Sequence, residues 1–133
     1  MRRLIEETEA RMLTEGYTHY WEHMGFDDKQ WAKLRAEVKK IIKKAQKDDV
    51  ALAGGDGHGK PTVTDYDITL NGKSPDDYET FHLSKGAQDF EFTKTEYRPY
   101  DSVVVSILAA AKKINRSFKP SSDGGSSAIK RIY

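Results

Sequence analysis

The chain has 133 residues, with 22 basic and 21 acidic side chains and no cysteine. The lack of thiols excludes a disulfide framework, a thiolate zinc site and a cysteine nucleophile. The near-neutral charge argues neither for nor against a nucleic-acid partner. No apolar run reaches membrane-spanning length, and residues 1–7 turn acidic where a signal peptide needs its apolar core. We therefore expect a cytoplasmic protein without a membrane partner.

Two helices are predicted in the N-terminal part of the chain. Over residues 2–15, apolar residues recur with a spacing typical of a helix, and Gly16 ends or bends it. A second helix begins at Asp27 or Asp28, either of which can cap it, and runs to about Lys47. Its apolar residues gather on one side and its lysines on the other, as in a helix that lies on a core. These lysines are Lys33, Lys39, Lys40, Lys43, Lys44 and Lys47.

A strand is predicted after the glycine-rich stretch 54–61. Tyr66, Ile68 and Leu70 alternate with polar residues, which indicates a half-buried strand with these three side chains on the core side. The Asn-Gly pair at 71–72 is typical of a turn that ends this strand.

Two further strands follow along the chain. Residues 78–83 predict the second strand, and the stretch around Phe90 and Phe92 predicts a third that ends before Pro99. Because short turns join the three strands, we expect an antiparallel meander.

Asp101 caps the last predicted helix, which runs from Val103 to about Ile114. It is apolar on most sides, so we expect it to pack across the sheet. Residues 1–120 are then one α+β domain with two N-terminal helices, a three-stranded antiparallel meander and an apolar C-terminal helix on the sheet. Residues 121–133 fit either a flexible tail or a short last strand.

Short motifs between residues 54 and 124 resemble a small uncharacterised protein family of bacteria and their phages. They are Gly-x-Gly-x-Gly-Lys-Pro, Glu79-Thr80-Phe81, Phe92-Thr93-Lys94-Thr95, Pro99-Tyr100-Asp101 and Ser121-Ser122-Asp123-Gly124. The resemblance implies a shared fold and no established activity. In a phage-encoded member, the natural role is that of a modulator of a host protein.

The segment from His19 to His23 spells H-x-x-E-H, the inverted zinc-protease signature. On a helix, His19 and His23 would share one face and could bind one Zn²⁺, with Glu22 as the general base. A third ligand would have to come from elsewhere in the fold. The alternative is an aromatic cluster in which both histidines are solvated.

Basic side chains outside this segment supply two further sets of candidates. The lysine side of helix 27–47 could bind nucleic acid, because phosphate contacts supply most non-specific affinity. No aromatic residue interleaves with these lysines as base stacking requires, so a solvated helix face is the alternative. In the loops, His58, Lys60, Lys94 and Arg98 are binding candidates, because binding residues concentrate on loops. Turn and capping roles are the alternative for these four.

The sequence contains no complete catalytic or cofactor motif. It therefore favours a non-enzymatic small binding protein that needs no cofactor and acts on another protein. Nucleic-acid binding through the lysines is the first alternative. The second is a small metal-dependent hydrolase that uses His19 and His23 or a set of carboxylates. That set is Asp65, Asp67, Glu79 and Glu91.

Overall fold

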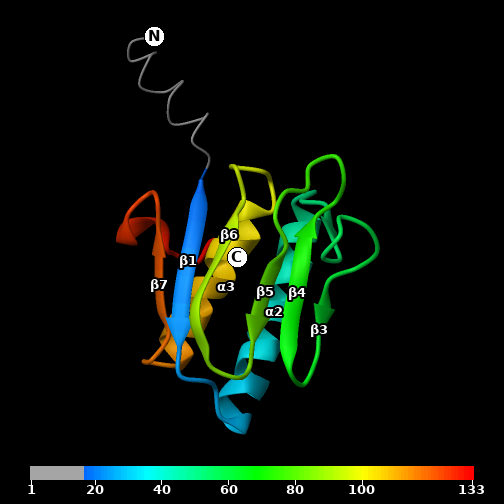
Figure 1. Ribbon diagram of the computed structural model, residues 1–133. Helices are drawn as coiled ribbons and strands as arrows, with labels where there is room; N and C mark the ends of the chain where they lie inside the picture. The colour runs from blue at the N-terminus through cyan, green and yellow to red at the C-terminus, as the bar shows by residue number, and fades with distance from the viewer. Residues whose placement is uncertain (1–16) are drawn as a thin grey trace, which may run out of the picture.

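A computed structural model describes residues 17–133 as a layer of strands backed by two helices (Figure 1). The helix predicted over residues 2–15 lies outside the described residues. In chain order, the elements are β1 Thr18–His23, α2 Asp28–Lys47, β2 Leu52–Ala53, β3 Thr62–Val63, β4 Asp67–Gly72, β5 Phe81–Ser84, β6 Gln88–Lys94, α3 Asp101–Ile114, β7 Lys119–Ser122 and the 3-10 turn Ser126–Ala128.

The strands form two sheets that lie side by side in Figure 1. One sheet has the order β6-β1-β7, and in the other β4 pairs with β2, β3 and β5. β1 is antiparallel to both of its neighbours, so β6 and β7 run parallel to each other on either side of it. Because α3 connects β6 to β7, the three strands and this helix form a split β-α-β unit.

Both helices cover the same side of the strand layer (Figure 1). α2 begins at a capping box, in which Gln30 N donates to the Asp27 side chain and Asp27 N donates to the Gln30 side chain. The apolar side chains that face the core from α2 are buried, except that of Ile42, which is half-buried. α3 is buried on most of its sides because it packs against both α2 and the strands.

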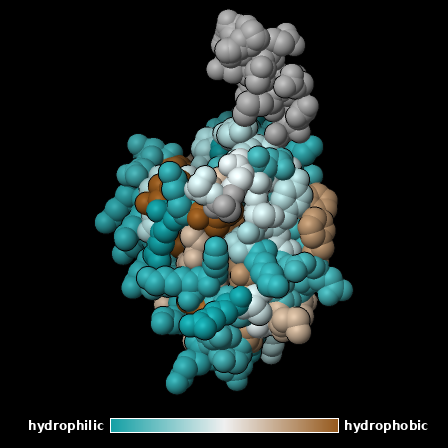
Figure 2. All heavy atoms as spheres, turned by 90° about the vertical axis from the view of Figure 1, so that its left-hand side faces the viewer, coloured by the Kyte–Doolittle hydropathy of each residue, from teal (hydrophilic) through white to brown (hydrophobic). Residues whose placement is uncertain are grey.

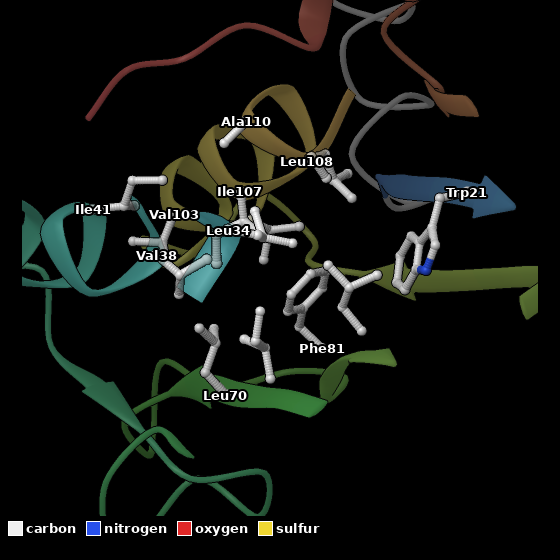
Figure 3. Packing of buried hydrophobic residues seen from close by; sticks show 14 of the residues in the cluster. Trp21, Leu34, Val38, Ile41, Leu70, Phe81, Val103, Ile107, Leu108 and Ala110 are labelled. Atoms are coloured by element: carbon white, nitrogen blue, oxygen red, sulfur yellow. The ribbon is translucent and has the colours of Figure 1, made fainter. Parts of the chain in front are cut away.

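The hydrophobic core lies between the helices and the strands (Figure 3). Leu34 of α2 and Ile107 of α3 face Leu70 of β4 and Phe81 of β5, and all four side chains are fully buried. The rings of Phe81 and Trp21 approach to 5.2 Å between centroids. Since Trp21 belongs to β1 and Phe81 to β5, this contact joins the two sheets through the core.

Gln88 bridges the two sheets where β5 and β6 do not form a ladder. Its side-chain oxygen accepts hydrogen bonds from Trp21 Nε1 at 3.1 Å, His23 Nε2 at 3.1 Å and Ser84 N at 3.2 Å. These donors come from β1 and β5. One amide therefore links strands that backbone hydrogen bonds leave separate.

The predicted layout of two N-terminal helices, a three-stranded meander and a C-terminal helix is wrong. Among the described residues, strand β1 comes first, and it contains the H-x-x-E-H segment, for which no strand is predicted. β6 leaves the meander and pairs with β1, and β7 follows α3. The buried side of β1 carries His19 and His23 beside Trp21, so its period-two pattern does not show as an alternation of apolar residues.

The predicted alternation in β4 is right at two positions of three. Ile68 and Leu70 are fully buried, but Tyr66 lies in a bend before β4 and is 76% exposed. The Asn-Gly pair at 71–72 is not a turn, because it ends β4 and pairs with β2. Asn71 is buried there, and its side-chain amide hydrogen-bonds backbone groups of two neighbouring loops.

Residues 121–133 contain the end of β7 and a segment that returns to the helices. Ser121 and Ser122 pair with β1. Further on, the amides of Ile132 and Tyr133 donate to Ser106 Oγ of α3 at 3.0 and 3.1 Å. Arg131 also pairs with Glu37 of α2 at 2.8 Å. These contacts attach the C-terminal residues to both helices.

Leu70→Ala is expected to lower the free energy of unfolding by about 2–5 kcal/mol, because Leu70 is fully buried and its surroundings relax only partly around the cavity. Tyr66→Ala is expected to change it by less than about 0.5 kcal/mol, because that ring lies in solvent. Urea unfolding followed by circular dichroism measures both values. Equal losses in the two variants would show that the buried face of this strand includes Tyr66.

Candidate functional site

Three aromatic side chains form a continuous surface on the outer side of the sheet β6-β1-β7. Along β1, Trp21 faces the core and Tyr20 faces outward, and Tyr20 lies opposite Phe92 in the β1–β6 ladder. The ring of Phe90 stacks on Tyr20 at 5.8 Å and lies 6.3 Å from Phe92, centroid to centroid. Phe90 is 60% and Phe92 53% exposed. We call Tyr20, Phe90 and Phe92 the aromatic face.

No described element covers the aromatic face, because α2 and α3 both lie on the other side of the strands (Figure 1). By contrast, the side of the molecule that carries β7 is largely hydrophilic, and its apolar atoms are confined to limited patches (Figure 2). Contiguous exposed apolar surface such as the aromatic face marks interaction sites in soluble proteins.

Asp123 holds Tyr20 in position. The Tyr20 hydroxyl donates to Asp123 Oδ1 at 2.9 Å, and this hydrogen bond raises the pKa of Tyr20 above its ordinary value. The second carboxylate oxygen of Asp123 accepts from Thr18 N at 3.1 Å. The ladder also places Glu22 opposite Lys119 and Thr18 opposite Lys94. Charges of both signs therefore surround the three rings.

His19 is a buried structural residue in the described part of the chain. Its Nε2 lies 2.5 Å from Asp101 Oδ1, and the same oxygen accepts from Thr95 Oγ1 at 2.5 Å. The side chain of His19 is fully buried. The pair attaches the central strand to the first turn of α3.

His23 is neutral in the folded protein. Gly25 N donates to its Nδ1 at 3.0 Å, so that nitrogen carries no proton, and its Nε2 donates to Gln88 at 3.1 Å. Burial lowers the pKa of His23 below the ordinary value of 6.5.

The helical geometry that a zinc site at His19 and His23 requires is not present. Both residues lie on a strand, where four residues span roughly 13 Å, so the two rings cannot share one ion. Glu22 faces the opposite side of the sheet. The alternative with two solvated histidines is also wrong, because both are buried. Within residues 17–133, no group of three or more histidines and carboxylates could hold a metal ion.

The acidic set proposed for a hydrolase is divided among separate contacts. Asp65 pairs with Arg35 at 2.5 Å, and Asp67 lies 3.2 Å from His82. Glu79 accepts a hydrogen bond from the backbone of Lys94 at 2.8 Å. These partners are structural and do not converge on one point.

The six lysines that the helical spacing places opposite the apolar side of α2 are all exposed. Lys40 is 3.6 Å from Glu37, a pair within the helix. Because α2 covers one side of the strand layer and the aromatic face lies on the other, rings and lysines do not form a common surface (Figure 1). Nucleic-acid binding by these lysines stays a prediction.

Three of the four loop candidates lie in connections, whereas Lys94 is the last residue of strand β6. His58 and Lys60 belong to the segment between β2 and β3, whereas Lys94 ends β6 and Arg98 precedes α3. The Arg98 guanidinium stands 5.7 Å from the centroid of the Tyr78 ring. Lys60 reaches the side of α2, where it lines a groove of about 480 Å³ together with lysines of that helix. The fold therefore places Lys60 beside lysines of α2.

Sequence reasoning did not find the aromatic face. Phe90 and Phe92 stand two apart, which places them on the same side of a strand. That spacing does not say which side is buried, and nothing local shows that Tyr20 pairs with this strand.

Comparison with protein-family models, curated proteins and solved structures finds no match to this chain. The resemblance to the family of bacteria and phages therefore stays a prediction, and function has to be argued from the geometry. Neither of the described helices has the length and apolarity that a membrane crossing requires.

His23 makes stability depend on pH. Since its pKa is lower in the folded protein than the value of 6.5 in the unfolded chain, the unfolded chain binds the proton more readily. The stabilisation is complete above the unfolded pKa and is lost as pH falls through the folded pKa. We expect His23→Gln to reduce the fall in unfolding free energy between about pH 7 and pH 5.

Urea titrations across this pH range measure the effect. His58→Gln is the matched control, because His58 is an exposed loop residue, and it should leave the pH dependence unchanged. An identical pH dependence in His23→Gln and the unmodified protein would contradict the assignment.

Proposed function

We propose that this protein is a non-enzymatic binding protein that contacts another protein through its aromatic face. The observation that carries the proposal is the arrangement of Phe90 and Phe92, more than half exposed and in contact with Tyr20 on an uncovered sheet. Aromatic side chains are enriched in the buried centres of protein interfaces and supply much of their affinity.

The rigidity of the surface supports this proposal. Phe90 and Phe92 belong to a paired strand, and the bond to Asp123 restrains Tyr20. A surface that is already ordered loses little conformational entropy when a partner binds. The partner chemistry that fits is a cluster of apolar side chains bordered by charges of both signs.

The charges around the rings favour a protein over a nucleic acid. Asp123 is hydrogen-bonded directly to Tyr20, and Glu22 lies on the same side of β1. Carboxylates at these positions would repel a phosphate backbone, whereas aromatic platforms for single strands are bordered by cations. A protein partner can match both signs of charge.

The biological setting belongs to the same proposal. A cytoplasmic location is part of this proposal and rests on the absence of cysteine. A role as a modulator of a host protein rests on the resemblance to phage-carried proteins. A catalytic role for the two histidines of β1 is disfavoured by their burial and by the hydrogen bonds at His19 Nε2 and at both ring nitrogens of His23.

The double variant Phe90→Ser/Phe92→Ser is expected to weaken binding to a partner by about tenfold or more, because both rings would lie at the centre of the interface. Captured proteins from a bacterial lysate are identified with the unmodified chain, purified and titrated calorimetrically against each variant. The unfolding free energy should change by less than about 1 kcal/mol, since both rings are exposed.

Tyr66→Ser is the matched control, because it removes an exposed ring outside the aromatic face. It should bind like the unmodified protein. If the partner is a second copy of this chain, sedimentation will show a dimer that the double variant abolishes. Unchanged affinity in the double variant would refute the proposal.

A further inference from the structure

A groove of about 480 Å³ lies between α2 and the segment that leads into β3. Three lysines border it, namely Lys39 and Lys43 from α2 and Lys60 from the loop. We call it the lysine groove. It lies against α2, so it is separate from the aromatic face on the other side of the strands.

The wall of the lysine groove contains apolar side chains. Ile42 of α2 and Val63 of β3 are half-buried, and both pack against the core. Leu52 of β2 is 7% exposed and also lines the groove. An apolar side chain placed here would leave water and contact a surface that the core already holds rigid.

The three lysines have no acidic partner within residues 17–133. In this part of the chain, two other cations of α2 are paired, Arg35 with Asp65 and Lys40 with Glu37. No carboxylate pairs with Lys39, Lys43 or Lys60 there. Three like charges around one concave surface produce a positive potential that attracts an anionic ligand.

We propose that the lysine groove binds an acidic peptide segment that carries an apolar side chain. Its carboxylates would pair with the three ammonium groups, and the apolar side chain would lie against Ile42 and Val63. This proposal is independent of the aromatic face and of the partner that binds there.

The chemistry of the groove disfavours nucleic acids and phosphate. Neither an aromatic ring nor a guanidinium group lines it, so bases would find no stacking platform. The neighbouring glycine loop offers few free amides for a phosphate. Gly54 N donates to His58 O, Gly57 N to Gly54 O, and His58 N to Asp56 Oδ1.

The experiment titrates the folded protein with a blocked seven-residue peptide of glutamate and aspartate around a central leucine, followed by amide NMR. Shifts are expected to concentrate at Ile42, Lys43, Leu52 and Val63. Lys39→Gln/Lys43→Gln should weaken binding about 5- to 20-fold, because two exposed charge pairs are lost. A peptide with serine in place of leucine should bind about tenfold more weakly.

Lys29→Gln/Lys33→Gln is the matched control, because it removes the same charge from exposed positions of the same helix that do not line the groove. It should weaken binding less than about twofold. The Phe90→Ser/Phe92→Ser protein should bind the peptide normally, which separates this proposal from the aromatic face. Equal losses in the two lysine variants would overturn it. Displacement of the peptide by an oligothymidine of equal charge would overturn it in favour of nucleic acid.

Discussion

The arrangement of the strands depends on the side-chain amide of Gln88. β5 and β6 follow each other in the chain but form no ladder. The Gln88 oxygen joins β6 to β5 by accepting from Ser84 N, and it also accepts from Trp21 and His23 of β1. Beneath it, the rings of Trp21 and Phe81 fill the space between the sheets. Because β6 is released from β5, it pairs with β1 over most of its length, and this pairing brings Tyr20 beside Phe90 and Phe92.

The two layers of the protein present different chemistry to solvent. The outer surface of α2 carries exposed lysines, whereas the outer side of β6-β1-β7 carries aromatic rings among charges of both signs. Since the core lies between these surfaces, each can contact a different ligand. Helix α2 lines a cationic groove and the strands carry an exposed aromatic surface, and these two features are the basis of the proposed binding role.

The candidate sites show how far local patterns extend. The stripe of lysines on α2 follows from helical spacing, and all six side chains are exposed as that spacing predicts. The histidine pair could not be interpreted in the same way, because H-x-x-E-H has chemical meaning only on a helix and this segment is a strand. Lys60 is part of a candidate site because it lines the same groove as residues of α2, a placement that helical spacing does not predict. The aromatic face requires residues some seventy positions apart, which no local pattern connects.

The sequence by itself determined the extent of α2 with an aspartate cap at its start, the end of α3, the burial of Ile68 and Leu70 and the absence of thiol chemistry. These features depend on hydrogen bonds and side-chain spacing within a few residues of the chain. Tertiary structure decided that β1 is a central strand, that Asn71 is buried and that three aromatic rings meet in solvent. Strand pairing and loop packing join distant residues, and whether such a contact forms depends on the free energy of the whole core.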